Sequence, residues 1–238
     1  MMSNQRGARL PYRLLAGVVP CPAGWLVARA KLQGITISPE EPFTVHSFVE
    51  VLDYKPAHQV IALAAPVGLP DDPAPGGRTC DRQARHLVGW PRCGAITSAP
   101  SRSDLQALSD GTEVHVSAVS RQMAGRVAEV DRALSPYWQR TVFEVHPELS
   151  FHQLNEDRPL SAPKHGPEGL AERRALLEHR MAGVSRILDA HLPGVDKAHL
   201  ADGAVCLWTA RRVAARAVTR LPDMPEWDSK GLRMEIVR

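Results

Sequence analysis

The sequence predicts an α/β protein in which a mixed sheet is covered by helices on both faces. Three short apolar segments, 14–19, 25–32 and 35–38, follow one another near the N-terminus with tight turns between them. This pattern is typical of an antiparallel three-strand meander. Further along the chain, strand-like segments alternate with longer segments of helical periodicity. A meander followed by such alternation predicts one sheet with both antiparallel and parallel pairs.

The elements after the meander are expected in a regular order. An apolar face at helical spacing predicts a helix over 43–54, and 59–65 is expected to be a buried strand before a loop rich in Pro, Gly and Asp. No repeat or long linker is present, so we expect a single domain, 14–238, after a flexible N-terminal arm, 1–13. Further helices are predicted at 78–88, 112–134, 147–154, 168–191 and 199–221, and strands at 142–146 and 232–237.

The composition is that of a folded protein with a sizeable core. The chain has 238 residues, of which 44% are hydrophobic and 23% charged. A net charge of +3 permits nucleic acid as a partner without arguing for it. Aromatic residues are only 5%, which argues against the stacking surface of single-strand binders. No apolar run reaches the length of about 18 residues that a membrane span needs, so no membrane partner is expected.

The cysteines indicate the compartment. None of the four, Cys21, Cys80, Cys93 and Cys206, forms a Cys-x-x-Cys pair, so a zinc knuckle is not expected. Scattered cysteines in a chain of this length are typical of reduced thiols, which predicts a cytoplasmic protein. The apolar run at 14–28 could imitate a signal peptide, but prolines and a glycine interrupt it, and two strands are favoured.

The stretch Val142–Phe151, VFEVHPELSF, is the strongest candidate site. Glu144 and His146 alternate with apolar residues, so on a strand they would share one face, about 7 Å apart. Pro147 ends the strand, and Glu148 falls in the first turn of the following helix. The three polar side chains are expected to meet where open α/β sheets bind ligands. The alternative interpretation is that Glu148 only caps a helix and His146 is structural.

Basic residues elsewhere are candidates for binding an anion. Arg78, Asp81 and Arg85 share one face of a predicted helix, at i, i+3 and i+7. They form either a surface ion-pair ladder or two guanidinium groups that Asp81 orients towards a phosphate. Lys164 lies in a polar loop, and Arg173 lies early in a predicted helix, where a positive charge opposes the macrodipole and hints at a nearby anion. We expect Arg78 or Arg85 on the wall of the crevice that holds the polar cluster of the candidate site.

The predicted order of elements is that of the ribonuclease H-like fold. Nucleases of that fold hold divalent metals with carboxylates from the first strand, the end of the fourth strand and a late helix. Six stretches carry a further resemblance: GVVPCPAGW, IALAAPVGLP, RTCDRQAR, AEVDRAL, VFEVHPELSF and LADGAVCLWTARR. In order and spacing they resemble the family called domain of unknown function 429, described as predicted nucleases with a ribonuclease H-like fold. The resemblance runs from about Gly17 to the C-terminus and implies a site for Mg²⁺ or Mn²⁺.

The chain departs from this family where the resemblance places the metal ligands. The aspartates of the first two family motifs fall on Val19 and Ala64, and only Asp202 remains of the last acidic cluster. Mg²⁺ requires near-octahedral oxygen coordination, to which apolar side chains contribute nothing. The implied metal site is therefore largely lost. Asp202 is expected to be a residual, weak ligand, and Mg²⁺ or Mn²⁺ to bind weakly or not at all.

Three functions remain open from the sequence. The first is a degenerate nuclease-fold protein that binds nucleic acid, a nucleotide or another phosphate ligand without metal-dependent cleavage. The second is an active hydrolase or transferase that uses Glu144, His146 and Glu148, with His146 as general base and Glu144 orienting it. The third is a scaffold for a protein partner or a second copy of the chain. The first is favoured, because metal catalysis contributes several kcal/mol that three protein groups would have to replace.

Overall fold

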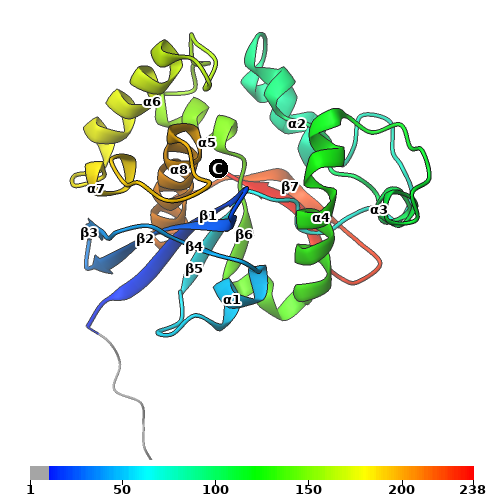
Figure 1. Cartoon of the computed structure of the whole chain (residues 1–238), viewed down its shortest axis with the longest axis horizontal. Coiled ribbons are helices and arrows are strands. Elements are labelled where there is room, and N and C mark those ends of the chain that lie inside the picture. Colours follow the sequence, from blue (N-terminus) through cyan, green and yellow to red (C-terminus); the bar gives the residue numbers. More distant parts are fainter. Residues whose placement is uncertain (1–10) are drawn as a thin grey trace, which may run out of the picture.

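A computed structural model describes residues 11–238 and contains a six-stranded mixed sheet with helices on both faces (Figure 1). Along the sheet the order is β3-β2-β1-β5-β6, and β4 pairs with β2 beside this path. The first three strands pair antiparallel, whereas β5 and β6 run parallel to β1. The predicted ribonuclease H-like α/β fold is confirmed. The strands are β1 (Arg13–Cys21), β2 (Gly24–Gln33), β3 (Thr36–Pro39), β4 (Phe43–Val45), β5 (Val60–Leu63) and β6 (Val142–Glu144).

Alternation of side chains along β1 and β2 produces two cores, one on each face of the sheet. Leu15 and Leu26 belong to the core beneath α8, which α5, α6 and α7 surround. Val18 and Trp25 belong to the core beneath α1 and α4. Figure 1 shows the group α5–α8 separated from α1 and α4 by the sheet. These helices are α1 (Phe48–Asp53), α4 (Ala118–Ala133), α5 (Pro147–Leu154), α6 (Pro167–Arg180), α7 (Ser185–Leu188) and α8 (Lys197–Ala214).

Two glycines allow α8 to lie directly on the sheet. A Cβ atom on Gly17 in β1 would lie 2.3 Å from the carbonyl oxygen of Gly203 and 2.3 Å from the backbone nitrogen of Leu207. A Cβ atom on Gly203 would lie 3.2 Å from Cβ of Ala28 in β2. Only glycine permits this close backbone approach at Gly17. Because Asp202 precedes Gly203, the contact places Asp202 near the end of β1.

The helix predicted over 43–54 is wrong in its first part. Residues 43–45 form β4, which pairs antiparallel with β2, and α1 begins only at Phe48. Ser47 caps α1, and Glu50 reaches back to the backbone N–H of Ser47, which completes a capping box. The apolar spacing was helical, but pairing with an available strand edge decided the first three residues.

The predicted helices near the C-terminus are also shorter than expected. In the segment 199–221 the helix, α8, already ends at Ala214. The last two residues of the segment belong to β7 (Arg220–Trp227). This strand pairs with β8 (Arg233–Val237) in a separate two-stranded sheet, so the expected closing strand exists but lies outside the main sheet. The helix predicted over 168–191 is divided into α6 and α7.

The middle of the chain contains one helix that the sequence did not predict. This helix is α3 (Arg102–Ser109), and the helix predicted from residue 112 begins only at Ala118. Ser101 caps α3 and Ser117 caps α4, each accepting a hydrogen bond from the third residue beyond it. The remaining helical elements are α2 (Thr79–Val88) and the 3-10 helices η1 (Arg92–Ala95) and η2 (Pro136–Arg140).

The structure also bears on the expectations about membrane spans, cysteines and the N-terminal arm. No helix within residues 11–238 is both long and apolar enough to cross a membrane. The four cysteines are free, and three of them are buried. The predicted flexible arm, 1–13, lies almost wholly outside the described residues, and β1 begins at Arg13.

Candidate ligand-binding cleft

A cleft of about 540 Å³ opens at the edge of the sheet where the parallel strands end. Val19 near the end of β1, Ala64 after β5 and Glu144 at the end of β6 line it. The first turn of α5 and the first half of α8 contribute further lining residues, and the loop 94–100 with the start of α4 forms another part of its wall. A volume of several hundred Å³ is typical of sites for small molecules and cofactors.

The cleft gathers most of the polar residues that the sequence identified. Arg85 is the exception, because it does not line the cleft. Its guanidinium donates to the carbonyl of Ile96, to Oγ of Ser98 and to the carbonyl of Gly76. Arg85 therefore stabilises the surrounding loops, and its assignment as a phosphate ligand stays a prediction that the cleft geometry does not support. The predicted residues that do line the cleft are Val19, Ala64, Arg78, Asp81, Glu144, His146, Glu148, Lys164, Arg173 and Asp202.

Arg78 is the centre of a buried ion-pair network in this cleft. Its Nη2 lies 2.7 Å from Oδ1 of Asp81 and 2.5 Å from Oε1 of Glu144. Nη1 also donates to the carbonyl oxygens of Val67 and Gly68. The three charged residues are only 2–6% exposed. Asp81 thus directs Arg78 towards an anion, as the spacing suggested, but that anion is a carboxylate of the protein.

Burial and pairing shift the pKa values of these carboxyl groups in opposite directions. Desolvation raises the pKa of Glu144 and outweighs the opposing charge of Arg78. Desolvation also acts to raise the pKa of Asp81, but the charge and hydrogen bonds of Arg78 prevail and lower it overall. Asp81 further accepts from the backbone N–H groups of Arg78 and Ala99. The difference follows from the number of donors that each carboxylate receives.

His146 caps α5, and within residues 11–238 its side chain has no hydrogen bond to Glu144. Strand β6 ends at Glu144, but the backbone stays extended at His146 and both residues line the cleft. Nδ1 of His146 accepts from the backbone N–H of Glu148 at 3.2 Å, whereas Oε2 of Glu144 accepts from the backbone N–H of Val67 at 2.6 Å. Each side chain thus has other hydrogen-bond partners, and a role of Glu144 in orienting His146 stays a prediction.

The environment of His146 determines its protonation. Desolvation lowers the pKa of His146 to about 4, so the ring is neutral at pH 7. Because Nδ1 is an acceptor, we assign the single ring proton to Nε2. A neutral ring in this tautomer has no free lone pair with which to take a proton from water or a substrate.

Arg173 and Glu148 form a second buried pair. Nη2 of Arg173 lies 2.8 Å from Oε2 of Glu148, and the guanidinium lies 5.2 Å from the ring centre of Phe151. Arg173 is 0% exposed and also donates to the carbonyls of Ala162 and Gly169. The anion near Arg173 is therefore Glu148, and Arg173 lies in the middle of α6, whereas it was early in the predicted helix 168–191. Within residues 11–238, Nε of Arg173 and Oε1 of Glu148 have no hydrogen-bond partner.

The residues at the strand ends do not fit a divalent metal ion. Val19 and Ala64 supply no oxygen, and Oδ2 of Asp202 lies 2.7 Å from Nζ of Lys164. Among the described residues, no group of three or more His, Cys, Asp or Glu side chains is arranged to hold a metal. An ammonium group thus supplies the positive charge beside the remaining carboxylate.

Part of the cleft wall was not predicted from the sequence. It is formed by Ile96 and Ala99 in the loop after η1 and by Val119 and Met123 in α4. Val119 is 52% exposed, although it is apolar. No motif marks these residues. Ile96 and Ala99 lie in a short segment, 95–99, of mixed apolar and polar residues without strand or helix periodicity.

The fold and the cleft define a mixed α/β protein with a cleft lined by charged residues at the carboxyl ends of its parallel strands. The family described as "Protein of unknown function (DUF429)" matches residues 17–227. The chain belongs to this family, and the resemblance found in the sequence is confirmed. No curated protein and no solved structure is similar enough to the chain to match it.

Proposed function

We propose that this protein binds a small phosphate-bearing ligand of nucleotide size in the cleft, without metal-dependent cleavage. The observation that carries the proposal is the ion pair of Lys164 and Asp202 beside Val19 and Ala64. Related nucleases place divalent cations at such strand ends, where this chain has an ammonium group. An ammonium group has three donors, so Lys164 can contact Asp202 and still bind a phosphate oxygen.

The charge balance of the cleft favours a small ligand over a nucleic-acid strand. A polymer groove needs several cations that are free to neutralise phosphates. In this cleft Arg78 binds Glu144, Arg173 binds Glu148 and Lys164 binds one carboxylate oxygen of Asp202. The lining contains the basic residues Arg78, Arg92, Lys164 and Arg173 and an equal number of acidic ones, Asp81, Glu144, Glu148 and Asp202.

The state of His146 supports binding over metal-free hydrolysis or group transfer. A general base needs a free lone pair within reach of the substrate. Nδ1 of His146 is occupied by the N–H of Glu148, and Nε2 carries the ring proton in the tautomer assigned above. Glu144 is engaged by Arg78 and is not available to replace it. The polar cluster therefore supports a role in shaping and holding a ligand site.

Calorimetric titration with nucleoside monophosphates tests the proposal. We expect binding that EDTA does not change and that Lys164→Ala weakens at least tenfold, a loss of about 1.4 kcal/mol. Lys230→Ala is the matched control, because Nζ of Lys230 lies 2.5 Å from Oδ2 of Asp131, outside the cleft. Binding abolished by EDTA, or an unchanged affinity of Lys164→Ala, would refute the proposal.

A further inference from the structure

One buried carboxylate oxygen in the cleft lacks a hydrogen-bond donor. Glu148 lines the cleft and is 6% exposed. Its Oε2 accepts from Arg173, whereas Oε1 accepts no hydrogen bond from any residue in 11–238. By contrast, Oε1 of Glu144 accepts from Arg78, and its Oε2 accepts from Arg78 and from the backbone of Val67. The unpaired oxygen is therefore not a general property of carboxylates in this cleft.

An unpaired buried acceptor favours a ligand that brings a donor. Removing a carboxylate oxygen from water costs free energy unless a hydrogen bond replaces the lost solvent. Arg173 donates to Oε2 of Glu148 and to the carbonyls of Ala162 and Gly169, and its remaining donor, Nε, makes no hydrogen bond to Oε1 within residues 11–238. A ligand N–H directed at Oε1 would gain a charge-assisted hydrogen bond, which is stronger than one between neutral groups.

The apolar part of the wall indicates the body that carries this donor. Ile96, Ala99, Val119 and Met123 line the cleft together with the charged residues. Val119 is 52% exposed, so a flat apolar body could cover it and gain from the hydrophobic effect. A nucleobase has such a body, with hydrogen-bonding groups only at its edge.

We propose that Oε1 of Glu148 accepts a hydrogen bond from the exocyclic amino group that a nucleobase carries at the position of the keto oxygen of hypoxanthine or the 4-keto oxygen of uracil, so that the ligand is a nucleotide of adenine or cytosine. This inference rests on the proposed phosphate-binding function and adds the class of base. Lys164 holds the phosphate, Glu148 selects an amino group over a keto group, and the apolar wall packs against the base. A keto oxygen opposite Oε1 would place two acceptors against each other, which is unfavourable in a buried site.

The test compares nucleotides in which this amino group is replaced by a keto oxygen, with a proton gained at the adjacent ring nitrogen. Calorimetry on the unmodified protein is expected to show AMP binding at least tenfold more tightly than IMP, and CMP at least tenfold more tightly than UMP. Equal affinities within each pair would overturn the inference while leaving the proposed function intact. Absence of binding by all four nucleotides would overturn both.

A substitution reverses the expected selectivity. In Glu148→Gln the amide oxygen can still accept from Arg173, while the amide NH₂ becomes a donor towards the cleft. We expect this variant to prefer IMP and UMP. Glu172→Gln is the matched control, because Glu172 accepts from the backbone of Ser161 and Ala162 and does not line the cleft. A folded Glu148→Gln variant that keeps the preference for AMP would overturn the inference. If the variant does not fold, the comparison on the unmodified protein decides.

Discussion

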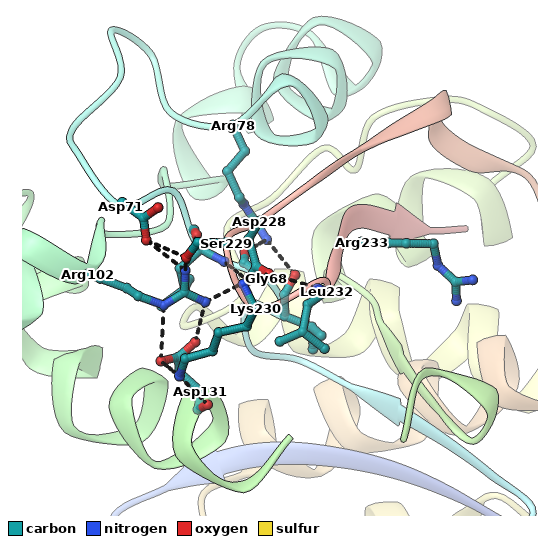
Figure 2. A network of polar contacts seen from close by, with 12 residues as sticks. Gly68, Asp71, Arg78, Arg102, Asp131, Asp228, Ser229, Lys230, Leu232 and Arg233 are labelled. Carbon is teal, nitrogen blue, oxygen red and sulfur yellow. Dashed lines mark hydrogen bonds and ion pairs between the residues drawn. The ribbon is translucent and has the colours of Figure 1, made fainter. Parts of the chain in front are cut away.

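Two arginine networks hold the segment that follows β5, and they differ in burial. Arg78 donates to the carbonyls of Val67 and Gly68, and Arg102 donates to the carbonyl of Leu69. Figure 2 shows the second network, in which Arg102 lies among Asp71, Asp131 and Asp228, and Arg78 reaches Gly68 from another side. The side chain of Arg78 is 1% exposed, whereas that of Arg102 is 18% exposed.

The number of ion pairs and their expected importance do not agree. Arg102 contacts three carboxylates, at 3.0 Å, 2.8 Å and 2.6 Å. Arg78 forms ion pairs with two carboxylates, those of Asp81 and Glu144, but all three charged groups are buried. A buried charge without a partner is strongly destabilising, whereas a surface pair contributes little. Burial should therefore decide the cost of breaking each network.

The largest effect is expected from Arg78→Met. This substitution leaves Asp81 and Glu144 buried without a counterion, so we expect a loss of about 3–5 kcal/mol in the free energy of unfolding. Urea denaturation followed by circular dichroism measures it. Arg78→Lys keeps the charge without the forked geometry and should be intermediate. A loss below about 1 kcal/mol for Arg78→Met would show that burial does not govern the comparison.

Burial also affects how the free energy of unfolding depends on pH, as the buried side chain of His58 shows. Desolvation lowers the pKa of His58 to about 4 in the folded protein, and this residue is 6% exposed. The unfolded chain therefore binds more protons between about pH 6.5 and 4. The stability due to this group is complete above about pH 6.5 and is lost as the pH falls towards 4, by roughly 2–3 kcal/mol at pH 4.5.

His58→Phe tests this dependence. The aromatic ring can keep the stacked contact with Tyr54, whose ring centre lies 5.2 Å away, but it does not titrate. Denaturation at pH 7 and pH 4.5 is expected to show that the variant loses less stability on acidification than the unmodified protein. An equal loss in both proteins would mean that other groups, such as His146, account for the acid sensitivity.

A smaller effect is expected from Arg102→Met. The loss in the free energy of unfolding should be about 1 kcal/mol and should decrease at high salt, because the network is partly solvated. The side chain of Asp228 is fully buried, but it also accepts from the backbone N–H groups of Leu69, Lys230 and Leu232, which continue to stabilise its charge. If Arg102→Met lost as much unfolding free energy as Arg78→Met, burial would not explain the difference between the two networks.

The smallest effect is expected from Lys230→Ala. Lys230 pairs with Asp131, but its side chain is 41% exposed. The change in unfolding free energy should stay within about 0.5 kcal/mol. Thermal denaturation of this variant beside Lys164→Ala also shows whether any loss of ligand binding in the latter reflects stability. A large destabilisation by Lys230→Ala would indicate that the surface network acts as one cooperative unit.

The sequence by itself determined the order of most elements and the place of the cleft. Three short apolar segments with tight turns predicted the meander, Pro147 marked the start of α5, and helices were also predicted over α2 and most of α8. The end of the strand at 142–146 was expected to be a ligand-binding edge, and the family resemblance placed Val19, Ala64 and Asp202 at the implied metal site. These inferences depend on local patterns and on general rules of connection, which a single sequence contains.

Only the tertiary structure decided which charges pair and which segments become edge strands. Arg78 and Glu144 are 66 residues apart, and Lys164 and Asp202 are 38 apart, so no local spacing relates them. β4 forms against β2 and β7 forms against β8, although the residues of β4 and the first two residues of β7 belonged to predicted helices. Hydrogen bonds to a neighbouring strand and the removal of charges from water are properties of the packed molecule. For this reason the ion-pair partners of Arg78, Arg173 and Lys164 can be identified only from the folded structure.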